Sequence, residues 1–95
     1  MLIDGASGNV GPFAVQIAKA RGLRVTGVCR TQKMDFVRSL GADEVIDYTT
    51  TDYTKTGTYD RIIDVDAHRS IFDYRKALRP GGVYISMGGN GIWIL

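Results

Sequence analysis

The sequence predicts an α/β fold, a doubly wound parallel sheet of about five strands in the order 3-2-1-4-5 with helices on both faces. Three observations support this class. A glycine-rich turn follows the first apolar strand and leads into an amphipathic helix, short apolar segments alternate with helical ones, and glycine or Pro-Gly separates them. No linker or internal repeat divides the chain, so residues 1–95 are expected to form a single domain. A ligand of such a sheet binds across the carboxyl ends of the strands, beside the first strand.

The glycine-rich turn comes directly after the first predicted strand, residues 2–4. Gly5 lets the chain leave the strand in a conformation that other residues avoid, Gly8 admits a pyrophosphate against the backbone, and Gly11 lets the helix lie close to the strand. Ala6 occupies the first position of the GxGxxG pattern, so the match is partial. The strand before the turn and the helix after it favour phosphate binding over an ordinary strand-to-helix turn.

The first helix is predicted over residues 10–21. Pro12 lies in its first turn, where a missing N–H costs least, and Gly22 supplies the C-terminal stop. Its apolar face is predicted from residues at helical spacing, namely Val10, Ala14, Ile17 and Ala18.

The remaining elements follow from the same alternation. Further strands are predicted at residues 23–28, 44–46, 61–65 and 83–87, and further helices at 31–40 and about 71–78. Thr31 is expected to be the N-cap of the second helix, and Pro80 with the glycines after it ends the third. Residues 49–58 contain few apolar side chains and predict a loop with a turn of helix.

The last four residues, 92–95, are apolar and have no obvious place in the predicted sheet. We expect a piece of a longer chain that lacks a sixth strand. The alternative is a surface that pairs with another molecule, such as a second copy of the chain in a homodimer.

The composition limits the classes of function. The chain is 44% hydrophobic and 23% charged, values typical of a globular domain. Its net charge is only +2, and Lys and Arg are spread along the sequence, so nucleic acid is not an expected partner. No stretch is long and apolar enough to span a bilayer and no secretory signal opens the chain, so a membrane is not expected either. The single cysteine allows no internal disulfide, which favours a reducing compartment, with the cytoplasm as the expected location.

Several motifs occur in collinear order along almost the whole chain. They are Gly-Ala-Ser-Gly-Asn-Val-Gly at 5–11, Ala-Val-Gln-Ile-Ala-Lys at 14–19, Leu-Gly-Ala-Asp at 40–43, Val-Ile-Asp-Tyr at 45–48, Tyr-Asp at 59–60 and Leu-Arg-Pro-Gly-Gly at 78–82. Together they resemble the medium-chain dehydrogenase/reductase superfamily, zinc-binding dehydrogenase type, and within it the quinone oxidoreductase or zeta-crystallin-like branch. The resemblance implies a Rossmann-type NADPH-binding domain from an enzyme that delivers hydride to a quinone or an α,β-unsaturated carbonyl. It also implies a separate catalytic domain outside this chain, so the chain alone is expected to be inactive.

The resemblance implies cofactor contacts and no catalytic residue within the chain. Pyrophosphate contacts would come from Ser7, Gly8, Asn9 and Val10, 2′-phosphate contacts from Arg30, Thr31 and Lys33 with Tyr48 nearby, and nicotinamide contacts from the backbone of Gly88 and Gly89.

The choice of cofactor also follows from charge. NAD-specific sites place a carboxylate about twenty residues past the glycines to hold the ribose 2′-hydroxyl, whereas an arginine there accepts a 2′-phosphate. This chain has Arg30 and Lys33 at the end of the second predicted strand, and no carboxylate. NADPH is therefore predicted over NADH, because a guanidinium can pair with the phosphate and a carboxylate would repel it. The alternative is that both residues are ordinary solvated surface charges.

Other reactive residues have weaker support. Cys29 could be a reactive thiol, but a buried cysteine acting as a small apolar residue is the favoured interpretation. His68 could donate a proton, but a surface position at the start of the third helix is favoured. Asp64 and Asp66 could act as an acid/base pair, but surface pairing or ribose contact is favoured, because hydride transfer needs no carboxylate pair. One cysteine and one histidine cannot form a zinc site, so no metal is expected.

Two other classes of function compete with a reductase. Residues 78–82 also resemble the LxPGG turn of S-adenosylmethionine-dependent methyltransferases, although those enzymes typically have an acidic residue where this chain has Arg30. A nucleotide-binding module without catalysis is the third interpretation.

Overall fold

The computed structural model describes residues 1–8, 10–65, 71–86 and 93–94, and it contains a six-stranded sheet with the order β3-β2-β1-β4-β5-β6. The strands are β1 (Leu2–Asp4), β2 (Thr26–Cys29), β3 (Glu44–Asp47), β4 (Tyr59–Asp64), β5 (Leu78–Ser86) and β6 (Trp93–Ile94). The helices are α1 (Gly11–Ala20), α2 (Met34–Ser39) and α3 (Ile71–Ala77), with short 3-10 helices η1 (Thr31–Lys33) and η2 (Tyr53–Lys55). The predicted α/β class is confirmed, as is a turn of helix within the loop at 49–58.

The first five strands are parallel and lie in the predicted order 3-2-1-4-5. β6 is antiparallel to β5, and pairs Ile94 with Ile85 and Trp93 with Ser86. The five predicted parallel strands are confirmed, and β6 is a two-residue antiparallel addition to them that the sequence does not predict. The outer edge of a strand offers backbone N–H and C=O groups that need partners, and a short extended segment at the apolar end supplies them.

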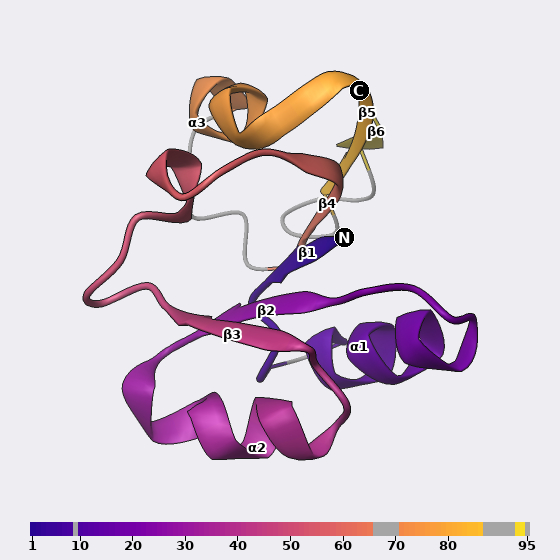
Figure 1. Cartoon of the computed structure of the whole chain (residues 1–95), viewed down its shortest axis with the longest axis vertical. Coiled ribbons are helices and arrows are strands. Elements are labelled where there is room, and N and C mark those ends of the chain that lie inside the picture. Colours follow the sequence, from indigo (N-terminus) through magenta and orange to yellow (C-terminus); the bar gives the residue numbers. More distant parts are fainter. Residues whose placement is uncertain (9, 66–70, 87–92, 95) are drawn as a thin grey trace.

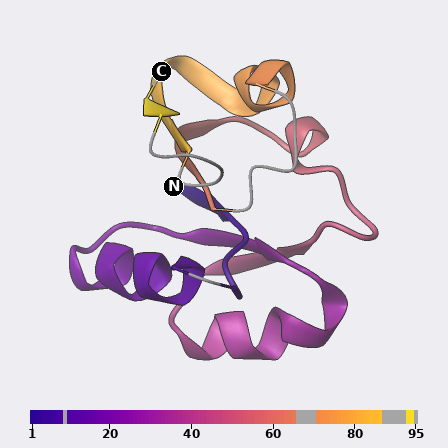
Figure 2. The same cartoon turned by 180° about the vertical axis from the view of Figure 1, so that it is seen from behind.

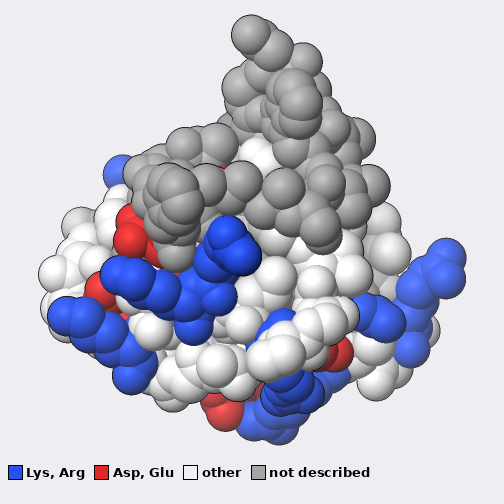
Figure 3. Space-filling model, turned by 90° about the horizontal axis from the view of Figure 1, so that it is seen from above, with Lys and Arg blue, Asp and Glu red and all other residues white. Residues whose placement is uncertain are grey.

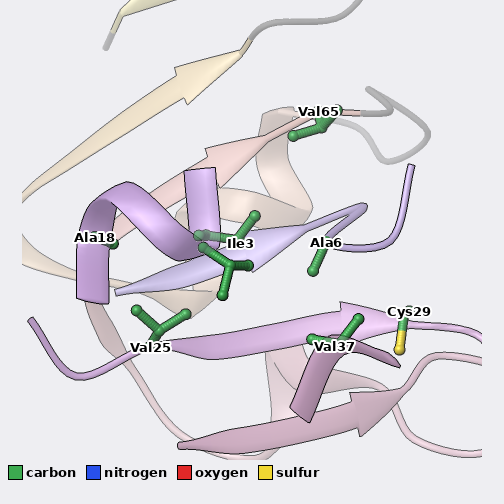
Figure 4. Packing of buried hydrophobic residues seen from close by; sticks show 8 residues of the cluster. Ile3, Ala6, Ala18, Val25, Cys29, Val37 and Val65 are labelled. Carbon is green, nitrogen blue, oxygen red and sulfur yellow. The ribbon is translucent and has the colours of Figure 1, made fainter. Parts of the chain in front are cut away.

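Helices lie on both faces of the sheet: α1 and α2 on one side and α3 on the other (Figures 1 and 2). The buried residues on the α1 and α2 side are Ile3, Ala6, Val15, Ala18, Val25, Cys29, Val37 and Val65 (Figure 4). Those on the α3 side are Leu2, Val28, Tyr53, Ile62, Tyr74, Ala77 and Tyr84. Neighbouring residues of β1 contribute to both clusters because side chains alternate along a strand, so β1 is the centre of the fold.

The face of α1 that packs on the sheet differs from the predicted one. Gly11, Val15 and Ala18 are its buried residues, whereas Val10 and Ile17 are 40% and 58% exposed. The predicted face is therefore correct for Ala18 and wrong for these two residues. The close approach of Gly11 to the turn at Gly5 and Ala6 fixes the rotation of the helix about its axis, and the apolar pattern alone does not contain that contact.

Three other details of the elements differ from the prediction. One is the start of β2, which the sequence predicts at residue 23 and which lies at Thr26. Thr31 does not cap α2: it begins η1, and its hydroxyl group donates a hydrogen bond to Asp47 instead. β5 begins at Leu78, earlier than predicted, because Leu78 already pairs with Tyr59 of β4. Gly82 lies close to β4 where the register between the two strands shifts, between Tyr59 and Arg61: a Cβ atom on Gly82 would lie 2.8 Å from the carbonyl oxygen of Asp60.

Candidate functional site

A cleft of about 210 Å³ lies at the carboxyl ends of β1 and β2. It is lined by Asp4, Gly5, Ser7, Gly8, Val28, Cys29, Arg30 and Tyr48. β1 has β2 on one side and β4 on the other, so the chain proceeds in opposite directions from this point. Such a switch point is where open α/β sheets bind ligands, and the cleft occupies the position that the sequence predicts.

The glycine turn forms one wall of the cleft. The φ angle of Gly5 is 84°, and the N–H groups of Gly5 and Ala6 donate to the carbonyl oxygen of Val28 at 3.1 and 3.0 Å, which ties the turn to the end of β2. A Cβ atom on Gly11 would overlap the backbone of Gly5 and Ala6. On Gly8, by contrast, a Cβ atom would meet nothing within 4 Å. The turn is therefore closed on its helix side and open at Gly8, which fits a ligand group lying against the backbone.

The N-terminus of α1 follows this open backbone. Its N-cap residue, Val10, makes no side-chain hydrogen bond to the helix, and the first turn contains no acidic residue. No described side chain of the helix therefore offsets the positive end of its dipole, which favours an anion there.

Arg30 and Tyr48 form a second wall of the cleft. Arg30 is exposed directly after β2, and Tyr48 is 43% exposed directly after β3. The backbone N–H of Tyr48 donates to the carbonyl oxygen of Cys29 at 3.1 Å, so the two loops lie side by side. On the face seen in Figure 3, by comparison, Lys and Arg lie in separate groups with acidic side chains among them. Among the residues that line the cleft, the Lys or Arg side chain is that of Arg30, so the positive charge on this wall comes from one guanidinium.

The structure brings together only some of the predicted cofactor contacts. Ser7, Gly8, Arg30 and Tyr48 line the cleft. Three others are close in sequence but do not line it, namely Val10, Thr31 and Lys33. The remaining three, Asn9, Gly88 and Gly89, lie outside the described residues.

Sequence reasoning missed Asp47, the last residue of β3, which joins the loops after β2 and β3. Its Oδ1 accepts hydrogen bonds from the backbone N–H and the hydroxyl of Thr49, at 2.9 and 2.6 Å, and its Oδ2 accepts one from the hydroxyl of Thr31. These bonds, that of Thr31 foremost, lower the pKa of the Asp47 carboxyl below its ordinary value. The usable signal in the sequence was a carboxylate and two threonines at the ends of neighbouring strands.

Buried carboxylates lie below the cleft among tyrosines. Oδ2 of Asp4 accepts hydrogen bonds from the hydroxyls of Tyr53 at 2.8 Å and Tyr74 at 3.3 Å. Asp64, the partner of Asp4 in the neighbouring strand, is fully buried and accepts one from Tyr84 at 2.8 Å. Burial, followed by the nearby carboxylates, raises the pKa of Tyr74. The favoured surface or ribose role of Asp64 is therefore wrong, while Asp66 and His68 lie outside the described residues.

Cys29 is 2% exposed and belongs to the core cluster on the α1 and α2 side. Burial, and then the Asp47 carboxylate, raises the pKa of its thiol, which disfavours the nucleophilic thiolate. The favoured interpretation of Cys29 as a small apolar residue is confirmed.

The zinc-binding dehydrogenase family model matches residues 9–92. The chain belongs to this family. Over 94 aligned residues it is 37% identical to the trans-enoyl reductase pgmF of Aspergillus terreus, across 93% of the chain and 26% of that protein. A shorter match, 54% identical over 50 residues, covers 53% of the chain and 15% of the chloroplastic quinone-oxidoreductase homolog of Spinacia oleracea. The structure of the quinone oxidoreductase from Coxiella burnetii matches with a TM-score of 0.80 and 26% identity, over 95% of the chain and 29% of that protein.

The predicted resemblance to the medium-chain dehydrogenase/reductase superfamily is thereby confirmed. The chain spans less than a third of the length of these relatives and corresponds to their cofactor-binding part. Family membership decides against the methyltransferase interpretation. No helix among the described residues is long and apolar enough to cross a membrane.

The family description raises the question of zinc. Within the described parts of the chain, no group of three or more His, Cys, Asp or Glu side chains is arranged to hold a metal ion. The single cysteine is buried in the core. This set of donors does not fit a zinc site.

Proposed function

We propose that the chain is the NADPH-binding part of an oxidoreductase that transfers hydride to a quinone or an α,β-unsaturated carbonyl. The observation that carries the proposal is the pairing, across one cleft, of an open glycine turn at a helix N-terminus with Arg30 at the end of β2. The first wall suits a diphosphate, and the second suits the 2′-phosphate that distinguishes NADPH from NADH.

The described residues fit this cofactor. Ser7 and the backbone at Gly8 would hold the diphosphate, where the absence of a Cβ atom leaves the space free. Arg30 would pair with the 2′-phosphate, with the exposed Tyr48 beside it. Bound NADPH supplies a hydride; the role of these residues is to bind and orient the nucleotide.

Asp4 is a carboxylate at the floor of the same cleft, and a bare carboxylate there would repel phosphate. Its Oδ2 accepts two tyrosine hydroxyls and its side chain is buried, with the residue only 1% exposed. These contacts direct that oxygen into the core on the α3 side, away from the solvent-facing walls that the phosphates would meet.

The class of substrate rests on the relatives. Two of them are named as a quinone-oxidoreductase homolog and a trans-enoyl reductase. Quinones and enones share a carbon–carbon double bond conjugated to a carbonyl group, which accepts hydride. We place no catalytic residue among the 95 residues, so we expect the chain alone to bind nucleotide without turnover.

Titration of the protein with NADPH, NADH and S-adenosylmethionine by calorimetry tests the proposal. NADPH is expected to bind most tightly. Equal affinity for NADH would refute the choice of NADPH, and tightest binding of S-adenosylmethionine would refute the reductase interpretation altogether.

We also propose the cytoplasm as the compartment, on the ground that the one cysteine is a buried free thiol. The name of the spinach relative places that protein in chloroplasts. Imaging of the tagged full-length protein distinguishes the two.

A further inference from the structure

The loops that carry the proposed 2′-phosphate contacts begin at the ends of two neighbouring strands, β2 and β3. Cys29 and Asp47 are partners in the register of β2 and β3. Arg30 and Thr31 follow the first strand, and residues 48 and 49 follow the second. All four of these loop residues are exposed, whereas Asp47 is buried between the loops with 8% exposure.

We propose that Asp47 is a positioning residue for the 2′-phosphate site: its carboxylate holds Thr31 and Thr49, and thereby keeps Arg30 and Tyr48 on one cleft. This inference rests on the proposed NADPH site and adds a determinant of its selectivity.

Each side chain that lines the phosphate wall is next in sequence to a threonine that Asp47 binds. The hydroxyl of Thr31, beside Arg30, donates to Oδ2, while the backbone N–H and hydroxyl of Thr49, beside Tyr48, donate to Oδ1 at 2.9 and 2.6 Å. The two threonine hydroxyls are also 3.4 Å from each other. A hydrogen bond to an ionised group is stronger than one between neutral groups, so this bridge is a strong link between the loops.

Positioning matters because a guanidinium and a phenol on separate exposed loops must be ordered before they can bind one phosphate. A bridge formed in the free protein removes part of that ordering cost. The selective gain is confined to NADPH, since NADH has a hydroxyl where the 2′-phosphate would be.

The proposed role of Asp47 does not involve contact with the nucleotide. Asp47 does not line the cleft, and its oxygens accept hydrogen bonds from threonines. A carboxylate turned to the ligand would disfavour a phosphate, so the negative charge of Asp47 and its bridging geometry act in opposite directions on NADPH. Asparagine separates the two effects, because it removes the charge while its amide can still bond to both threonines.

The test measures dissociation constants of NADPH and NADH for the wild type, Asp47→Ala, Asp47→Asn and Thr31→Val, together with thermal unfolding. Asp47→Ala and Thr31→Val are expected to lower the preference for NADPH over NADH by roughly tenfold, the size of one hydrogen bond to a charged group. Asp47→Asn is expected to keep that preference within about twofold, since one charge-assisted bond is exchanged for a neutral one of similar geometry.

Asp43→Ala is the matched control. Asp43 also accepts a backbone N–H, from Val25 at 2.8 Å, and a side-chain donor, Lys19 at 2.9 Å, but it precedes β3 and lies at the opposite end of the strands. It should lose stability without changing the ratio of the two dissociation constants. If Asp47→Ala unfolds, Thr31→Val and Thr49→Val decide together, because each removes a single hydroxyl from an exposed residue. Thr49 is not one of the predicted 2′-phosphate contacts, so a loss of preference in Thr49→Val reports on the bridge alone.

The outcomes separate the two proposals. A wild type without preference for NADPH refutes the proposed function, and the positioning role with it. A wild type with that preference, together with folded Asp47→Ala or Thr31→Val variants of unchanged preference, refutes the role of Asp47 alone. A loss of preference shared equally by Asp43→Ala also refutes it, since general loosening of the fold would then explain the effect.

Discussion

Gly11, the first residue of α1, packs so closely against the carbonyl oxygen of Gly5 that a Cβ atom at residue 11 would overlap that oxygen. Gly5 itself has a φ angle of 84°, a conformation that side chains disfavour. The two glycines therefore set the distance between β1 and α1. They also place the N-terminus of α1 beside the cleft, so the packing of the fold and the position of the proposed phosphate site have one cause.

Gly11→Ala should destabilise the protein by about 2 kcal/mol or more, because the methyl group must displace backbone and not a flexible side chain. Urea unfolding monitored by circular dichroism measures the change. Gly22→Ala is the comparison for backbone strain without a steric clash, since Gly22 has a φ of 78° and no atom lies within 4 Å of its Cβ position. A Gly11→Ala variant as stable as the wild type would contradict the close packing.

Gly8→Ala should have the opposite effects, namely little change in stability and a loss of nucleotide affinity. Its Cβ atom meets nothing within 4 Å, and its φ is not in the left-handed region, so the free energy of unfolding should change by less than about 0.5 kcal/mol. The methyl group would stand where the diphosphate is proposed to lie, so the affinity for both NADPH and NADH should fall by about tenfold or more. Unchanged affinity, measured by calorimetry, would show that the diphosphate does not bind against Gly8.

Arg30→Glu should weaken NADPH much more than NADH, because it replaces the proposed 2′-phosphate partner with a repelling charge. We expect the preference for NADPH to fall by roughly a hundredfold, two steps of about 1.4 kcal/mol. Arg79→Glu is the control, since it makes the same change of charge on an exposed residue of β5 that is not part of the cleft. Equal losses of affinity for NADPH and NADH would show that Arg30 does not bind the 2′-phosphate.

The features that the sequence predicts correctly arise from residues that are close together in the chain or from the order of the elements. The positive φ of Gly5 and the close packing of Gly11 are predictable because both arise within one turn of the chain. The strand order followed from the alternation of elements and the right-handed connection between parallel strands.

The missed features depend on contacts between distant residues. The partner of Asp47 across the two loops, Thr31, is 16 residues away, and Asp4 and Tyr53 are 49 residues apart. A hydrophobic pattern marks which residues of α1 are apolar but not which of them the sheet covers. For that reason Ile17 was predicted on the apolar face and is found 58% exposed.

The two sides of α1 should respond differently to truncation. Val15 is fully buried in the core cluster, so Val15→Ala should cost about 2 kcal/mol through lost burial and a cavity. Phe13 is 66% exposed, so Phe13→Ala should cost less than about 1 kcal/mol although it removes a larger side chain. Urea midpoints of the two variants give the comparison. A larger loss for Phe13→Ala would show that the face of α1 is assigned incorrectly.

Acid should weaken the fold partly through Asp43 and Asp47. The backbone N–H of Val25 and then Lys19 lower the pKa of Asp43 in the folded protein, and the hydroxyls of Thr31 and Thr49 lower that of Asp47. A carboxyl whose folded pKa lies below its unfolded value stabilises the fold above the unfolded pKa of about 4, and this contribution disappears as the pH falls through the folded value. The loss of stability caused by Asp43→Asn or Asp47→Asn should therefore be full at pH 7 and shrink towards pH 3. Urea unfolding at both pH values measures it. Asp35→Asn is the control for net charge, because the Asp35 side chain is fully exposed and its ion pair with Arg38 lies on the surface of α2. A difference between wild type and variants that stays constant from pH 7 to pH 3 would show that these hydrogen bonds do not favour the ionised carboxylates.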